Sequence, residues 1–203
     1  MIMCTYDRAD LLPRAIDSLL AQHEADWELV VVDDASTDDT HRVVLQYAAT
    51  DARIRLETRP ANGGVAAARN TGIAAANGLF VTFLDSDDAY APDHLSSRRQ
   101  MLVENDDILF LHGGVTVIGD PWVIDKDDPT KKIHVQDCVV GGSFVIRYDA
   151  LHRIGSFSEG TYADDAEFFE RAANMGILIA KTDHSTYLYY RNTPNQLTST
   201  HGS

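Results

Sequence analysis

The sequence predicts an α/β fold in which helices cover both faces of a doubly wound, mostly parallel sheet. Apolar runs of strand length alternate along the chain with stretches whose apolar residues recur at helical spacing. The run 27–32 is continuously apolar after Glu28, as strands buried on both faces are. Two of these runs stop abruptly in carboxylates, at Asp33-Asp34 and at 85–88, which is typical of strand ends that face a ligand crevice.

The first 90 residues predict four strands with helices between them. A strand over 1–4 leads through a polar loop to a helix that Asp10 caps, with Pro13 harmless in its first turn. Ser36 and Asp39 form a capping-box pattern that opens the next helix. Further on we expect a strand over 54–57, an Ala-rich helix over 65–76 that Asn77-Gly78 closes, and a central strand over 79–84.

The second half of the chain continues the alternation with one interruption. We expect a helix from Pro92-Asp93, a strand over 108–118 interrupted at Gly113-Gly114, an apolar run over 141–146, a short helix ending at Gly155, an amphipathic helix over 164–174, and strands over 177–180 and 187–190. The segment 119–137 has little periodicity, which predicts a mobile or specificity-determining loop.

Composition excludes several classes of protein. At 203 residues the chain suits one well-packed domain. The formal net charge of −14 argues against nucleic acid and anionic lipid as partners, and an acidic site that handles phosphates needs a cation. Cys4 and Cys138 give neither a disulfide framework nor a zinc pattern. With no apolar run of membrane-spanning length and no secretory signal, we expect a cytoplasmic protein, peripheral to the membrane if a partner holds it there.

The acidic turn after the central strand is the first candidate site. Asp85 and Asp87 are hard oxygen ligands on a rigid strand end, which suits a divalent cation carrying a phosphorylated substrate. The alternative is that acidic residues merely form the turn after a strand.

Five stretches taken together are similar to a known family. They are Thr5-Tyr6-Asp7-Arg8-Ala9-Asp10-Leu11-Leu12, Val31-Val32-Asp33-Asp34-Ala35-Ser36-Thr37-Asp38, Asn62-x-Gly64-x-x-x-Ala68-Arg69-Asn70-x-Gly72, Phe83-Leu84-Asp85-Ser86-Asp87-Asp88 and Gly141-Gly142-Ser143-Phe144. In this order and spacing they resemble family 2 of the nucleotide-sugar-dependent glycosyltransferases, which have the GT-A fold. The resemblance covers residues 1 to about 192. It implies one GT-A catalytic domain over 1–203, with a nucleotide-sugar-binding half (1–90), a smaller acceptor-side half (91–192) and a polar tail (193–203).

The resemblance also implies a set of donor-binding residues, with Mn²⁺ or Mg²⁺ as the cofactor. Those assigned to the nucleotide sugar are Thr5, Tyr6, Asp34, Asn62, Gly64, Arg69, Asp85 and Ser86. Tyr6 would lie against the base, Asp34, supported by Asp33, would accept the pyrimidine N–H, and Arg69 would reach the phosphates. Asp87 matches the metal ligand. The alternatives are a surface tyrosine at position 6, a turn-capping pair at 33–34 and a solvated helix charge at position 69.

On the acceptor side the resemblance assigns the base to Asp165. Asp164 would support it by raising its pKa through like-charge repulsion, and Arg191 lies in the family's closing Tyr-Arg stretch. The alternative is that both aspartates only cap a helix, and both interpretations can hold together.

The chain departs from the family's pattern in two places. Cys4 replaces a proline or small polar residue, which puts contacts there in doubt. Thr193 stands where many members have a histidine, so we assign no histidine metal ligand and leave His184 and His201 without a role.

We therefore expect a metal-dependent, inverting glycosyltransferase that moves a sugar from a UDP-sugar to a hydroxyl of a saccharide or other acceptor, in polysaccharide or glycoconjugate biosynthesis. The alternatives are a catalytically silent nucleotide-sugar-binding domain and a haloacid-dehalogenase-type phosphohydrolase. The phosphohydrolase usually has Thr or Val where this chain has Ala89. A nucleotidyltransferase would need a glycine-rich signature where residues 5–8 contain no glycine. The sugar, the acceptor, the linkage and the oligomeric state stay open.

Overall fold

A computed structural model describes residues 1–125, 128, 130–160 and 163–192 of the chain. The helices are α1 (Leu12–Leu20), α2 (Thr40–Ala48), α3 (Gly64–Ala75), α4 (His94–Glu104), α5 (Tyr148–Ile154) and α6 (Asp164–Asn174). The strands are β1 (Ile2–Thr5), β2 (Leu29–Asp33), β3 (Ile54–Thr58), β4 (Phe80–Thr82), β5 (Ala89–Tyr90), β6 (Phe110–Gly119), β7 (Trp122–Ile124), β8 (Lys132–His134), β9 (Val145–Arg147) and β10 (Ile179–Arg191). Two 3₁₀ turns, η1 (Val135–Asp137) and η2 (Gly141–Ser143), precede β9. None of the helices in these ranges is long and apolar enough to span a bilayer.

Two sheets meet to form the centre of the molecule. The first has the order β1-β2-β3 and is fully parallel. The second has the order β4-β9-β6-β10-β5, in which β6 and β10 are parallel while β9 and β5 run antiparallel to their neighbours. A parallel bridge between Ile2 and Phe83 joins the sheets, and the Leu84 N–H donates to the Ile2 carbonyl at 3.0 Å. The predicted α/β class with a mostly parallel central sheet is confirmed.

Strand residues alternate between two buried cores because successive side chains point to opposite faces of a sheet. Ile2, Val30 and Val32 face α3 and belong to the core that continues under α5 and α6. Met3 and Val31 face the other way and pack against α1. Both sides of the sheet are therefore covered, as the continuous apolar run in β2 predicts.

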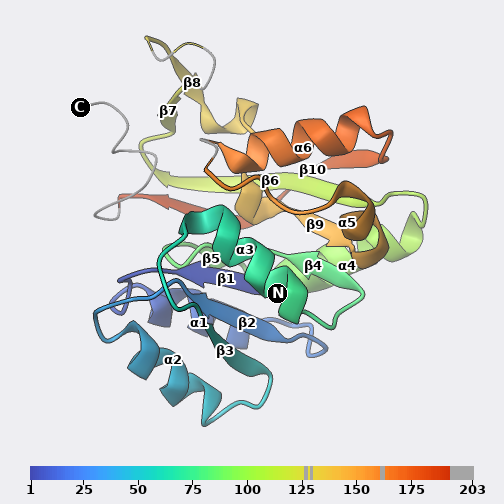
Figure 1. The fold of residues 1–203 in the computed structure, drawn as a ribbon. Helices are drawn as coiled ribbons and strands as arrows, with labels where there is room; N and C mark the ends of the chain where they lie inside the picture. The colour runs from blue at the N-terminus through green and yellow to red at the C-terminus, as the bar shows by residue number, and fades with distance from the viewer. Residues whose placement is uncertain (126–127, 129, 161–162, 193–203) are drawn as a thin grey trace.

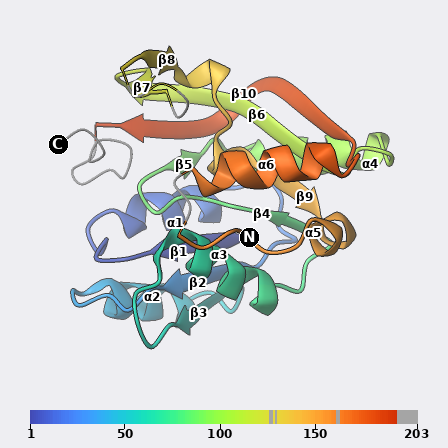
Figure 2. The same cartoon turned by 45° about the horizontal axis from the view of Figure 1, so that its top comes forward.

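The helices follow from their apolar spacing and from how each meets the sheet. Leu12, Ala15, Ile16 and Leu19 are fully buried along one side of α1. Figure 1 shows α2 beside β3 at one end of the molecule and β7 with β8 at the other. Helix α6 lies across β6 and β10 in both views (Figures 1 and 2), where Phe168 and Phe169 contact Phe110.

The residues predicted to cap three of the helices do not cap them. The N-cap of α1 is Leu11 rather than Asp10, and α2 has no capping box. Ser36, the expected cap, binds the neighbouring loop instead, where its Oγ accepts from the Asp7 N–H at 2.9 Å. Asp39, the other expected member, pairs with Arg42. The carboxylate at the helix start is Asp38, which accepts from the Thr40 N–H at 2.9 Å. After α3 the chain turns extended at Ala76, so Asn77-Gly78 does not form a helix C-cap.

Two predicted segments also differ from the structure. The loop expected over 119–137 contains β7 and β8, which pair antiparallel, followed by η1. The two expected last strands are the single strand β10, whose pairing with β6 is irregular between Thr182 and Tyr187. The short strand β5 was not expected. The predicted polar tail over 193–203 lies outside the described residues.

Candidate active site

One edge of the joined sheets gathers the predicted site residues. Strands β1, β2 and β4 run in the same direction, so their carboxyl ends open on a common crevice. The surroundings of the Cys4 thiol, near the end of β1, indicate which residues lie together at this edge. Burial raises the pKa of the thiol to about 12, and the charges of Arg69, Asp85, Asp164 and Asp34 all act on it. Residues from four distant parts of the sequence therefore share one place.

At the end of β2, Asp34 is buried and its carboxylate accepts three hydrogen bonds. Arg59 Nη1 donates at 2.6 Å, and the N–H groups of Gly63 and Gly64 donate at 3.1 Å and 2.8 Å. The structure thus brings Asp34 together with Gly64, as expected, while the arginine was missed by sequence reasoning. Asn62 is exposed beside this loop.

The neighbouring donor-site candidates differ in exposure. Tyr6 is 45% exposed, so its ring is open to a stacking partner. Thr5 is buried, and within the described part of the chain its Oγ1 has no hydrogen-bond partner. Asp33 is buried and accepts from the Ser36 N–H at 2.9 Å, which fixes the turn that carries Asp34.

Arg69 is buried at the centre of the edge rather than solvated. Only 6% of the residue is exposed, which rules out a solvated helix charge. Its Nη1 lies 2.8 Å from Asp164 Oδ2 and its Nη2 lies 3.8 Å from Asp85 Oδ1. The rings of Phe83 and Phe157 lie against the guanidinium, with centroids 5.7 Å and 5.2 Å from Cζ. The side chain is a fixed cation that connects a carboxylate of the turn after β4 with one at the start of α6.

The turn after β4 carries the predicted metal-side carboxylates. Burial raises the pKa of Asp85 to about 6, with the charges of Asp87 and Asp165 adding to the shift and Arg69 opposing it. Arg8 Nη1 approaches Asp87 Oδ2 at 3.4 Å, and Ser86 is buried between the two aspartates. Burial is the main cause of the raised pKa of Asp85, and the neighbouring carboxylates Asp87 and Asp165 add to it.

This turn fits a divalent cation whose coordination shell is completed by substrate oxygens and water. Among the described residues, no group of three metal-ligating side chains is assembled. Mg²⁺ keeps several waters and is typically bound by one or two carboxylates together with substrate phosphates. Asp85 and Asp87 supply that number, and a cation would offset the crowding of charge.

Asp165 lies at the start of α6 with its carboxylate held in place. The residue before the helix is Ala163, in the left-handed region with φ 55°, so Asp164 and Asp165 begin the helix rather than capping it. Asp165 Oδ2 accepts from the Gly141 N–H at 3.0 Å and Oδ1 from its neighbour Ala166 at 2.9 Å. Burial raises the pKa of this carboxyl and the charge of Asp164 adds to it, with Arg69 opposing.

Besides Arg59, sequence reasoning missed two residues of the site, Asp88 and Tyr187. Asp88 is fully buried, and its carboxylate accepts from Tyr187 Oη at 2.6 Å and from the Tyr190 N–H at 2.8 Å. Tyr187 Oη also lies 3.3 Å from Asp85 Oδ2. A third consecutive acid in the turn was a visible signal for Asp88. Nothing local marked Tyr187, which lies about one hundred residues further along the chain.

The remaining residues contact other parts of the chain. Arg191 ends β10, and its guanidinium lies 3.4 Å from the carbonyls of Asp120 and Trp122. His184, left without a role, pairs at 2.8 Å with Asp93, the residue before α4.

Comparison with known sequences gives one consistent answer. The sequence profile of glycosyl transferase family 2 matches residues 1–157. A UDP-Glc:alpha-D-GlcNAc-diphosphoundecaprenol beta-1,3-glucosyltransferase, WfgD of Escherichia coli, is 35% identical over 145 residues, which cover 70% of this chain and 56% of the relative. The succinoglycan biosynthesis protein ExoO of Rhizobium meliloti is 41% identical over 120 residues, or 55% of this chain and 34% of the relative. The chain thus spans about half or less of the length of these relatives.

Comparison with solved structures supports the fold. S. aureus TarS 1–349 in complex with UDP-GlcNAc superposes with a TM-score of 0.78 at 23% identity, covering 98% of this chain and 60% of that one. The mannosyltransferase PcManGT from Pyrobaculum calidifontis in complex with GDP-Man and Mn²⁺ gives 0.75 at 23% identity, covering 97% and 57%. With the profile match over more than half of its length, this chain belongs to glycosyl transferase family 2 and has the GT-A fold.

Proposed function

We propose that this chain transfers a sugar from a nucleoside-diphosphate sugar, with UDP as the nucleotide, to a hydroxyl of a saccharide or other acceptor. The observation that carries the proposal is the arrangement at one sheet edge. There Arg69 lies between Asp85 on the metal side and Asp164, next to the proposed base. Family membership and the polysaccharide-related names of its relatives support the same class of reaction, in polysaccharide or glycoconjugate biosynthesis.

For the donor, the exposed Tyr6 ring offers a stacking surface for the base. Asp34 offers a carboxylate acceptor for the pyrimidine N–H, at a point where Arg59 already holds it in position. The start of α3 lies next to Asp34, since the N–H groups of Gly63 and Gly64 donate to its carboxylate. The neighbouring structures are complexes with UDP-GlcNAc and with GDP-Man and Mn²⁺, which supports a nucleotide-sugar donor for this edge.

Asp87, with Asp85 beside it, would hold Mn²⁺ or Mg²⁺ against the donor diphosphate. When bound, the cation offsets the charge that builds on the departing nucleoside diphosphate. Arg69, whose Nη2 lies 3.8 Å from Asp85 Oδ1, would add a fixed positive charge that offsets the charge on the leaving diphosphate.

Asp165 is the proposed general base. Its carboxylate takes the proton of the acceptor hydroxyl while the acceptor oxygen bonds to the anomeric carbon and the bond from that carbon to the diphosphate breaks. The raised pKa makes this carboxylate a stronger base than an exposed aspartate. One base and one displacement give inversion at the anomeric carbon.

The donor site is tested by calorimetry with UDP, with and without Mn²⁺. We expect Mn²⁺-dependent UDP binding by the wild type and a loss of at least tenfold in Asp87→Ala, since a charged ligand is removed. Asp107→Ala is the matched control, because Asp107 is an exposed carboxylate before β6. Unaltered metal-dependent binding by Asp87→Ala would refute the metal site.

A panel of nucleotide sugars followed by thermal shift, with and without Mn²⁺, then identifies the donor. The donor that stabilises the chain most is tested for UDP release with saccharide acceptors. Release above the Asp165→Asn background supports transfer. Tight donor binding without turnover in any acceptor screen would instead favour the silent nucleotide-sugar-binding alternative.

A further inference from the structure

Strands β6 and β10 separate at one point, directly beside the acidic turn. Their pairing runs from Thr182 opposite Gly113 to Tyr187 opposite Val115, so β10 advances five residues (182 to 187) while β6 advances two (113 to 115). Gly113 and Gly114 have φ values of 90° and 67°, which only glycine adopts easily. We call residues 183–186 the β10 bulge.

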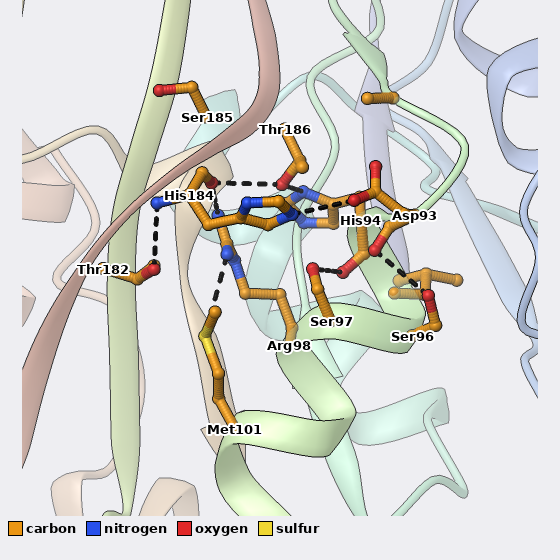
Figure 3. Close-up of polar contacts among 12 residues, drawn as sticks. Asp93, His94, Ser96, Ser97, Arg98, Met101, Thr182, His184, Ser185 and Thr186 are labelled. Atoms are coloured by element: carbon orange, nitrogen blue, oxygen red, sulfur yellow. Dashed lines mark hydrogen bonds and ion pairs between the residues drawn. The ribbon is translucent and has the colours of Figure 1, made fainter.

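The first turns of α4 hold this bulge in place (Figure 3). Arg98 Nη2 donates to the Gly113 carbonyl at 3.2 Å and to the His184 carbonyl at 2.9 Å, so one guanidinium connects the two separated strands. His94 Nδ1 lies 2.9 Å from Thr186 Oγ1, and the imidazole of His184 pairs with Asp93 at 2.8 Å.

The buried groups in this contact are better explained by the positions that they fix than by a gain in stability. Arg98 is 1% exposed and His94 is fully buried. Within the described part of the chain, Arg98 forms no ion pair, and its Nε and the Nε2 of His94 have no hydrogen-bond partner. Arg98 Nη1 lies 4.0 Å from Met101 Sδ and its Nη2 donates to the two carbonyls, so none of the described carboxylates balances the buried charge, which is costly. The arginine instead fixes where two specific carbonyls lie.

The position fixed in this way determines which side chain meets the acidic turn. Tyr187 is the first residue after the bulge, and its Oη reaches Asp88 at 2.6 Å and Asp85 at 3.3 Å. A shift of β10 by one residue would turn Thr186 or Leu188 toward the turn, because strand side chains alternate. Leucine has no donor for the carboxylate, and threonine is far shorter than tyrosine.

Tyr187 is packed as closely as this role requires. A Cβ on Gly142 would lie 2.1 Å from Tyr187 Oη, so the glycine makes room for the hydroxyl. Tyr90 packs against the same ring with centroids 5.8 Å apart and stacks on His94 at 3.7 Å. The tyrosine is therefore enclosed between η2, β5 and α4.

We propose that Arg98 and His94 form a positioning device that sets the register of β10, and that Tyr187 transmits this register to the Asp85–Asp88 turn. Tyr187 is a positioning residue for the donor and metal site, and Arg98 acts through it. This inference rests on the proposed function for its first readout, and on folding for its second.

The experiment measures UDP–Mn²⁺ affinity by calorimetry for wild type, Tyr187→Phe, Arg98→Met and the double variant. Loss of a hydrogen bond to a charged group predicts about tenfold weaker binding for Tyr187→Phe. Arg98→Met should weaken binding by about threefold or more, and the double variant should bind no worse than Tyr187→Phe, because coupled residues are not additive. Arg98→Lys, which retains a donor, should recover part of the loss.

Tyr90→Phe is the matched control, since its hydroxyl donates to the Phe83 carbonyl at 2.7 Å and touches no carboxylate of the turn. It should lower the unfolding temperature while keeping the affinity within about twofold of wild type, because the loss is confined to folding. The inference would be overturned if Tyr187→Phe bound UDP–Mn²⁺ as tightly as wild type. It would also be overturned if the fold-loss of affinity in the double variant equalled the product of the two single fold-losses.

A second measurement separates this inference from the proposed function. If wild type itself fails to bind UDP–Mn²⁺, the proposed function fails. Wild type and the same three variants are then compared by urea unfolding. Non-additive changes in the free energy of unfolding for Arg98→Met and Tyr187→Phe support the register device, and additive changes overturn it.

Discussion

Replacing Gly141 with alanine would displace the proposed base without changing any charge. The added Cβ would lie 2.8 Å from Asp165 Cβ, 3.1 Å from Arg69 Nη2 and 3.2 Å from Asp165 Oδ2. Ordinary contacts begin at 3.4 Å, so the start of α6 must move by 3.4 − 2.8 = 0.6 Å. A misplacement of about 1 Å can cost about 100-fold in rate, so we expect kcat to fall by about 10-fold to 100-fold.

The backbone itself accepts the substitution, because Gly141 is not among the residues with positive φ. Overpacking should lower the free energy of unfolding by about 1–3 kcal/mol. UDP–Mn²⁺ affinity should change less than kcat, since the contact with Arg69 Nη2 is longer (3.1 Å) than that with Asp165 Cβ (2.8 Å) and Asp34 and Asp87 are not among the atoms that the new Cβ meets. The assay is UDP release from the donor selected by the thermal-shift panel, corrected for the folded fraction.

Gly176→Ala is the matched control at the other end of α6. Gly176 has φ 71° and open space around its Cα, so alanine costs about 1–2 kcal/mol of backbone strain without a clash. Its kcat per folded molecule should equal that of wild type. If Gly141→Ala also retains the wild-type kcat, the placement of Asp165 as base is refuted.

Two further predictions concern α6 and α3. The rate should fall as pH falls through the raised pKa of Asp165, since a base acts deprotonated; the acid limb of kcat should lie above the ordinary aspartate range and move to lower pH in Asp164→Asn. A limb that stays in place contradicts the assignment. Asn70→Ala removes two bonds to the Phe157 backbone, at 3.0 Å and 2.8 Å, and should lower the urea-measured free energy of unfolding by about 2–3 kcal/mol. Thr71→Ala, which loses only a bond within α3, should change it by less than about 0.5 kcal/mol; equal losses would contradict this role of Asn70.

Much of the fold could be predicted because local patterns determine it. Apolar spacing located α1 and α6, and the acidic strand ends of β2 and β4 located the edge where the site lies. The family stretches named Asp34 and Arg69, the family's acidic pair named Asp165, and the structure brings these three to one edge. Features that depend on a short stretch of sequence could therefore be predicted.

The missed features depend on contacts between distant segments. Whether Ser36 caps a helix depended on a competing N–H from Asp7, which no local pattern reveals. Tyr187 looks like any strand aromatic until the β10 bulge sets its register opposite Asp88. The paired strands β7 and β8 come from a segment whose charges and prolines hid its short alternation.

The joint between the two sheets has a consequence for how the molecule holds together. Ile2 and Phe83 form an isolated backbone bridge, so side chains carry much of the attachment between the two halves. Arg69 from the first half grips Asp164 from the second, at the edge assigned to the donor. A ligand bound across that edge adds its own contacts to both halves. Binding of a ligand at that edge would therefore also strengthen the attachment between the two halves, and a weaker attachment would lower the affinity for the ligand.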